Sequence, residues 1–219
     1  MRTIIQITII SILFAACKMD NRDDIDRMLD NTRENLKKEG KKFNAENRQW
    51  DSVINNIYEV SKLDKKLAYQ KVDLLISNNP QFDQFKIQDL HFTKGDLLYQ
   101  NDSLNEAVKE FTKSGINFPT SLAARAGAYL KLKQYRACLG DLNKAAEINS
   151  EYYWNIGNYY EVVNKKDSAL FFYKKLFAND SVIYKYCGDR IKELKYTKTK
   201  PLTELKPIDY RKFKIIMAE

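Results

Sequence analysis

The 219-residue sequence has few of the residues that break helices or build catalytic and metal sites. It contains seven glycines, four prolines and a single histidine, His91. One histidine cannot supply a two-histidine metal site, and no two of the three cysteines have metal-ligand spacing. A glycine-rich phosphate loop and a G-x-S-x-G motif are also lacking. We therefore expect no enzyme activity, no metal and no cofactor, and we interpret His91 as a surface or packing residue.

Long hydrophobic runs are also scarce, and the one that stands out extends from Ile4 to Ala16 and stops at Cys17. It follows Arg2 and ends in two alanines, a layout typical of a secretory signal peptide. It is too short for a membrane-spanning helix, which needs about 20 apolar residues. The stretch FAAC resembles the lipobox of bacterial lipoproteins, in which the cysteine is lipidated and becomes the first mature residue. The resemblance implies a signal peptide over residues 1–16 and a lipid anchor at Cys17.

An alternative interpretation is an ordinary secretory signal that is cut nearby and leaves Cys17 as a free thiol. The following stretch, KMDNRDD, is similar to the signals that send lipoproteins of Bacteroidota-like bacteria to the cell surface. These resemblances imply a lipid-anchored protein of the outer membrane that faces the periplasm or the cell surface. Residues 17–50 are rich in charge and sparse in apolar residues, which favours a helical or disordered tether.

The composition of the remaining chain predicts an all-α protein, because Leu, Ala, Lys and Glu are common and breakers are rare. The net charge of +8 is concentrated at the end. From Lys185 to Glu219 there are ten Lys or Arg residues against five Asp or Glu residues. In an exported protein, anionic lipid, wall polymers or an acidic partner suit this charge better than nucleic acid does. The simpler interpretation is that these charges belong to a solvated helix end and a basic C-terminal segment, residues 196–219, that binds no partner.

A repeat with a period of 31 residues lies between Asp89 and Leu194. It has a small residue, an aromatic or leucine three residues later, a polar turn, a second small residue, and a large apolar residue four positions further on. The three sets are the first small residues Gly95, Ala126, Gly157 and Gly188, the second small residues Ala107, Cys138 and Ala169, and the large residues Phe111, Leu142 and Tyr173. Two antiparallel helices pack closely where one presents a small side chain to the bulk of the other. The repeat therefore predicts stacked helix pairs.

This pattern resembles the tetratricopeptide repeat (TPR), although the family's unit has 34 residues. The resemblance implies a TPR-like α-solenoid over residues 51–195. In the best copy we expect the turn at NKKDS, with Asp167 or Ser168 capping the second helix, and we expect Pro119 to close the first copy. Cys138 occupies a slot that alanine fills in neighbouring copies, so we expect it to be a small, buried hydrophobic side chain. Cys187 belongs to a copy two steps away, too distant to bond with Cys138.

In TPR proteins the first helix of each pair lines a concave groove that holds a peptide. Carried over slot by slot, the resemblance implies a groove lined by Phe92, Asp96, Tyr99, Lys131, Trp154, Asn158 and Glu161. Some of these residues would instead pack against the terminal segments if the groove is filled by the chain itself. We expect a lipoprotein that binds a protein or peptide partner in the envelope. Alternatives are a structural subunit of an outer-membrane assembly machine and an immunity-type lipoprotein that binds a toxin.

Overall fold

The computed structural model describes residues 22–179 and 185–196. Within these ranges the regular secondary structure is helical, with α-helices α2 to α10, the 3-10 helix η1 and no strand. This confirms the all-α prediction. The apolar run that ends at Cys17 and the basic segment 197–219 lie outside the described residues, so the lipidation of Cys17 stays a prediction. Contacts divide the chain into two units, residues 1–56 and 57–219, which we describe separately.

The described part of the first unit is the long helix α2, which begins at Arg22 and continues into the second unit as far as Leu63. Exposed ion pairs one turn apart, such as Asp30–Arg33 at 3.6 Å and Glu34–Lys38 at 3.9 Å, give it modest support. Between residues 22 and 50 the predicted tether is therefore helical. The helix does not break at residue 51, where the sequence suggested the start of the repeat domain.

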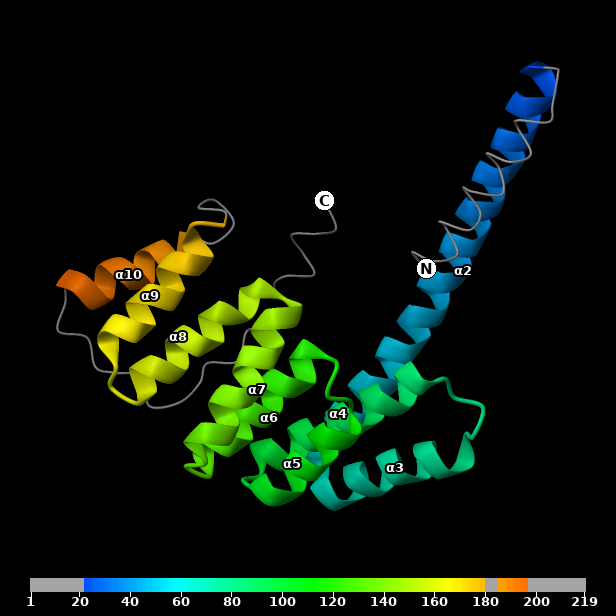
Figure 1. The fold of residues 1–219 in the computed structure, drawn as a ribbon. Coiled ribbons are helices and arrows are strands. Elements are labelled where there is room, and N and C mark those ends of the chain that lie inside the picture. Colours follow the sequence, from blue (N-terminus) through cyan, green and yellow to red (C-terminus); the bar gives the residue numbers. More distant parts are fainter. Residues whose placement is uncertain (1–21, 180–184, 197–219) are drawn as a thin grey trace. The chain divides into compact units, whose positions relative to one another are not determined.

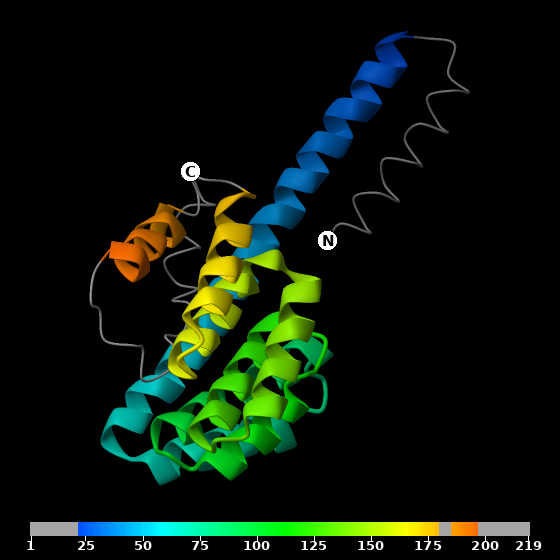
Figure 2. The ribbon, with the colours of Figure 1, turned by 60° about the vertical axis from the view of Figure 1, so that its left-hand side comes forward.

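The second unit consists of helix pairs stacked one after another (Figures 1 and 2). The elements after α2 are α3 (Lys65–Asn78), α4 (Gln84–Gln100), α5 (Leu104–Lys113), α6 (Pro119–Lys131), α7 (Tyr135–Ile148), η1 (Ser150–Tyr152), α8 (Tyr153–Val162), α9 (Lys166–Phe177) and α10 (Lys185–Tyr196). The most extensive packing joins α4 with α5, α6 with α7, and α8 with α9. The pairs are connected through α5 and α6, and α10 packs against α9. This is the solenoid of stacked helix pairs that the 31-residue period predicts.

The turns between paired helices repeat the same backbone geometry at the same spacing. Asp102, Lys133 and Asn164 are 31 residues apart, and their φ angles of 55°, 58° and 58° lie in the left-handed region. In each turn the next residue's N–H donates to the carbonyl five positions earlier, as in Gln134 to Tyr129 at 2.8 Å. This is the Schellman ending of a helix, which usually places glycine at the left-handed position. The 31-residue period therefore applies to the backbone conformation of the turns as well as to the types of side chain.

Close packing at the small residues confirms the predicted clearance. A Cβ atom at Gly95 would lie 2.7 Å from Cδ1 of Phe111, and one at Gly157 would overlap the Tyr173 ring. The second small residues Ala107, Cys138 and Ala169 are fully buried. Cys138 and Cys187 are both buried and free, as expected.

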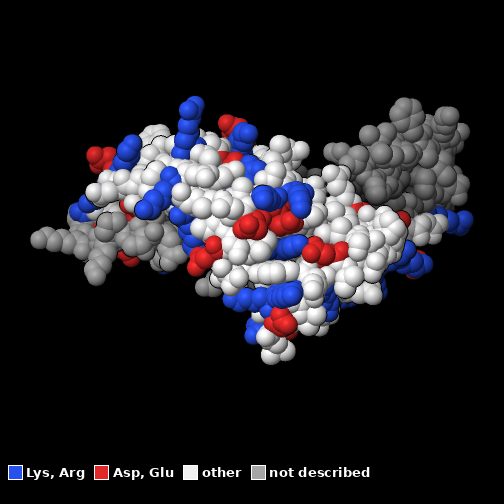
Figure 3. Space-filling view, turned by 90° about the horizontal axis from the view of Figure 1, so that it is seen from below, with Lys and Arg blue, Asp and Glu red and all other residues white. Residues whose placement is uncertain are grey.

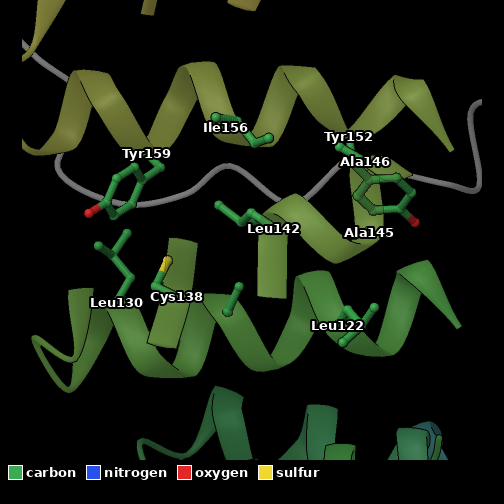
Figure 4. Close-up of a cluster of buried hydrophobic side chains, with 10 residues drawn as sticks. Leu122, Leu130, Cys138, Leu142, Ala145, Ala146, Tyr152, Ile156 and Tyr159 are labelled. Atoms are coloured by element: carbon green, nitrogen blue, oxygen red, sulfur yellow. The ribbon is translucent and has the colours of Figure 1, made fainter. Parts of the chain in front are cut away.

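The largest buried cluster joins α6, α7 and α8 (Figure 4). In it Leu142 of α7 lies between Leu122 of α6 and Ile156 of α8, and Tyr152 lies beside Ala146. The cluster takes its members from two successive pairs, so each pair buries the apolar face that it could not cover alone.

Several local expectations are wrong. The last turn is shorter than NKKDS: α8 ends at Val162 and α9 begins at Lys166, so neither Asp167 nor Ser168 caps it. The N-cap residue is Lys165, which makes no side-chain cap bond. Pro119 does not follow a helix but begins α6, where its missing N–H has no intrahelical partner to lose.

Candidate functional site

Two of the predicted groove residues, Tyr99 and Lys131, lie together where α4 faces α6. The ammonium of Lys131 lies 4.3 Å from the centre of the Tyr99 ring, within reach of a cation–π interaction. The same ammonium is 3.0 Å from Oδ1 of Asp102, whose side chain is 79% exposed. The Tyr99 ring therefore packs against the Lys131 ammonium, and the carboxylate of Asp102 remains exposed to solvent.

Asp96 extends this cluster along α4. Its Oδ2 accepts hydrogen bonds from the Tyr58 hydroxyl and from Nε2 of Gln100, both at 2.8 Å. We call the set the α4–α6 surface; its members are Tyr58, Asp96, Tyr99, Gln100, Asp102 and Lys131. Carboxylate, amide, ammonium and aromatic groups from α2, α4, the turn after α4 and α6 belong to this set. Such a set can fix the register of a bound peptide by hydrogen bonds and hold a side chain against the Tyr99 ring.

Gly127 of α6 belongs to the same place, and the sequence interpretation did not include it. A Cβ atom at Gly127 would lie 3.6 Å from the Tyr99 hydroxyl. That distance is ordinary van der Waals contact, so Tyr99 lies against α6 at Gly127 and a methyl group would also fit there. The signal that was missed lies in the position after the first small residue of each copy. That position is glycine after Ala126, whereas it is Asp96 and Asn158 in two other copies.

Phe92, like Tyr99, borders a buried cluster formed by α4 and α5. Its ring centroid is 5.6 Å from that of Phe111, and it packs against the buried cluster formed by Leu98, Ala107 and Phe111. It is half-buried, so its main contacts are internal. It supports the neighbouring α4–α6 surface from the core side.

Trp154 packs within the chain, between α9 and α10. Its ring centroid is 4.9 Å from Tyr173 and 4.8 Å from Tyr186, the second contact edge-on. It also borders the buried cluster of Ala169, Tyr173 and Leu194. Trp154 is half-buried and its aromatic partners come from α9 and α10, so its role as a ligand anchor stays a prediction.

Asn158 and Glu161 do not line an open surface, since they are only 0% and 3% exposed. The Tyr173 hydroxyl donates to Oε1 of Glu161 at 2.6 Å and lies 2.7 Å from Oδ1 of Asn158. The Arg190 guanidinium of α10 pairs with both oxygens of Glu161, with Nε at 2.9 Å from Oε1. Burial and the bond to Glu161 raise the pKa of Tyr173, and the same carboxylate raises the pKa of Arg190. A buried pair of this kind holds helices together and leaves Glu161 unavailable to a partner.

Titratable groups elsewhere are also engaged in packing. Glu110 accepts from Lys113 at 2.8 Å and lies 2.7 Å from Nδ1 of His91. Burial opposes ionisation of Glu110, but the bonds from His91 and Lys113 outweigh it and lower its pKa to about 2. Burial raises the pKa of the Cys138 and Cys187 thiols to about 12, so neither is a reactive thiolate at neutral pH.

Arg125 joins two successive helix pairs. Its Nε and Nη2 bind the two carboxylate oxygens of Asp141 at 2.7 and 2.8 Å, and its Nη1 lies 2.9 Å from Oγ1 of Thr112. The pKa of Arg125 is raised, chiefly by the bond to Asp141. This fork fixes α6 against both α5 and α7, and thereby positions the helix that carries Lys131.

Across residues 22–179 and 185–196, no group of three or more His, Cys, Asp or Glu residues is arranged to hold a metal ion. The same part of the chain contains no helix long and apolar enough to cross a membrane. On the face drawn in Figure 3, cationic and anionic side chains lie next to each other rather than in separate fields.

No protein-family model and no curated protein sequence matches the chain. Among solved structures it is similar to a tetratricopeptide repeat protein from Parabacteroides merdae, with a TM-score of 0.52 and 19% identity over 66% of this chain. The match spans 59% of that protein, less than two thirds of its length.

Two crystal structures of MamA are also similar, with TM-scores of 0.46 and 0.45 and identities of 15% and 13%. They cover 63% and 68% of this chain and 85% and 97% of theirs. At these identities the likeness concerns the fold alone. The repeat geometry and the P. merdae structure together identify the fold as a TPR-like helical solenoid.

Proposed function

We propose that this protein is an envelope lipoprotein, anchored through Cys17, whose TPR-like solenoid is a scaffold that binds a protein or peptide partner. The observation that carries the binding role is the fold. Stacked helix pairs present an extended surface built from the first helix of each pair, and solenoids use such surfaces to bind other chains. A TPR-like fold supports protein–protein interaction as the general role.

The partner surface in this proposal is the α4–α6 surface. Lys131 and Asp102 form an exposed ion pair, which contributes little to folding because water screens it. Such a pair can exchange its partner for a group on a bound chain at small cost. Trp154, Asn158 and Glu161 are not part of the proposed surface, because their partners lie within the chain.

The anchor in this proposal rests on sequence features. Arg2, the apolar run Ile4–Ala16 and the two alanines before Cys17 together resemble a lipoprotein signal. Lipidation at Cys17 would hold the scaffold on the outer membrane, facing either the periplasm or the cell surface.

The anchor is tested by labelling cells with radioactive palmitate. The wild-type chain should incorporate label and Cys17→Ser should not. The matched control is Cys138→Ser, which removes a buried thiol and should be labelled like the wild type. Equal labelling of the wild type and Cys17→Ser would refute the anchor.

The binding role is tested by affinity purification of the tagged chain, followed by mass spectrometry. A genuine partner should be recovered with the wild type and with Lys109→Glu, a change on the exposed face of α5. Lys131→Glu should recover at least fivefold less of it. Partners that are recovered equally with all three chains would place binding outside the α4–α6 surface.

A further inference from the structure

The end of α2 and the helix α3, at the start of the second unit, expose leucines where the end of a solenoid normally carries polar residues. Leu63 at the end of α2 is 91% exposed, and Leu67 and Leu74 of α3 are 51% and 58% exposed. A shallow hollow of about 270 Å³ between the end of α2 and α3 is lined by Val60, Leu67, Gln70, Lys71 and Leu74. Terminal repeats usually carry a polar outer face because nothing stacks on them. The exposed face of α3 is therefore suited to a further helix.

We propose that this face pairs with the same face of a second copy of this chain, with the two α3 helices antiparallel. Leu67 and Leu74 are seven residues apart, so they lie within about 20° of each other around α3. In an antiparallel pair related by a two-fold axis near Gln70, Leu67 lies opposite Leu74 of the second copy, and Leu74 lies opposite the other Leu67. Both leucine contacts form at once because the interface is isologous.

One pair of charged residues on α3 fits this arrangement, and Lys71, which also lines the hollow, lies opposite Gln70 of the other copy. Lys66 and Asp73 are also seven residues apart, and they lie on one flank of the leucine stripe. Their midpoint falls next to Gln70, as does the midpoint of Leu67 and Leu74. A two-fold axis brings the same flank of both helices together with opposite direction, so each Lys66 lies beside Asp73 of the other copy. Asp73 already binds the Lys94 ammonium at 2.6 Å, yet its side chain is 59% exposed and can accept a second cation.

This self-complementarity identifies a second copy as the occupant, rather than an unrelated helix. An unrelated partner would need apolar and charged groups at matching positions, whereas α3 carries the complement of its own pattern. The inference does not rest on the proposed function, because it uses α3, whereas the partner surface uses α4 and α6.

A symmetric disulfide tests the pairing in intact cells that express the full chain. Gln70→Cys places a thiol near the two-fold axis, so oxidation with diamide should give a covalent dimer on a non-reducing gel. The control is Gly140→Cys, an exposed position on α7 with no atom within 4 Å of an added Cβ. Of the three natural cysteines, Cys138 and Cys187 are buried and should not contribute. Cys17 is present in both the test chain and the control chain, so any dimer that it forms raises both yields equally. We expect at least fivefold more dimer from Gln70→Cys than from the control.

Charge reversal distinguishes a second copy from another protein. In the Gln70→Cys chain, Lys66→Asp alone and Asp73→Lys alone should each lower the dimer yield at least threefold. Co-expression of these two variants with tags of different size should restore the yield in the mixed dimer, because both flank contacts then again join an acidic side chain to a basic one. Equal yields from Gln70→Cys and Gly140→Cys, no restoration in the mixture, or an adduct with a protein of different mass would overturn the proposal.

Discussion

Tyr173 lies directly against the backbone of Gly157, and a Cβ atom at that glycine would overlap the ring. The ring is fully buried, and its hydroxyl is held by Asn158 and Glu161, so it cannot move aside without breaking these bonds. The pair joins α8 to α9 at the position where Gly95 and Phe111 join α4 to α5.

Gly157→Ala should therefore destabilise the fold, although alanine is the better helix former. Overpacking of a close contact typically costs about 1–3 kcal/mol. The matched control is Gly140→Ala on α7, where an added Cβ meets nothing within 4 Å. That change should stabilise the protein by about 0.5–1 kcal/mol, since it removes only the entropic cost of glycine. Chemical denaturation of both variants measures the difference, and equal midpoints would contradict the assignment of α8 and α9 as a packed pair.

Lys133→Gly should raise stability by about 0.5–1 kcal/mol. Lys133 occupies the left-handed position of the turn between α6 and α7, with φ of 58°, and a side chain with a Cβ is strained there. Asn164→Gly in the equivalent turn should gain less, because asparagine tolerates this conformation better. Thermal melts of the two variants provide the comparison, and a loss of stability in Lys133→Gly would show that the turn has another conformation in solution.

Glu110→Gln should remove a pH-dependent part of the stability. The pKa of Glu110 in the folded chain is lowered from 4.5 to about 2, so its contribution is complete above pH 4.5 and is lost as the pH falls towards 2. The variant should be less stable than the wild type at pH 7, by on the order of 1–3 kcal/mol. The two free energies of unfolding should converge near pH 2. Parallel curves from pH 5 to pH 2 would mean that the bonds to His91 and Lys113 do not form.

Trp154→Ala should destabilise the fold by about 2–4 kcal/mol, because the residue packs between Tyr173 and Tyr186. Thermal melts with and without the change test this. A melting temperature like that of the wild type would keep Trp154 a candidate for partner binding.

The sequence could predict the helix pairs and their contacts because these depend on local spacing. Gly95 meets Phe111 within one helix pair, and Gly157 meets Tyr173 within another. Each contact joins residues 16 positions apart, so the period alone specifies which residues meet. The left-handed turn positions could also have been found, since Asp102, Lys133 and Asn164 follow the same period.

The placement of the α8 residues could not be predicted in this way, because it depends on a helix further along the chain. Glu161 is buried by its pairing with Arg190, 29 residues later on α10. One signal was present in the sequence: Tyr173 occupies a slot that is Phe111 or Leu142 in the other copies, and a buried hydroxyl requires a polar partner nearby. That requirement points to Asn158 and Glu161 as internal rather than ligand-facing residues.

The most direct test of the proposed scaffold role is the dissociation constant for a partner found by affinity purification, measured with the wild type, Tyr99→Ala and Lys109→Ala. Tyr99 lies over Gly127 on the α4–α6 surface, and Lys109 is exposed on α5. We expect Tyr99→Ala to weaken binding at least fivefold at a temperature where its thermal melt shows the chain folded, and Lys109→Ala to leave binding unchanged. Unchanged binding by Tyr99→Ala would contradict the assignment of this surface as the site that holds the partner.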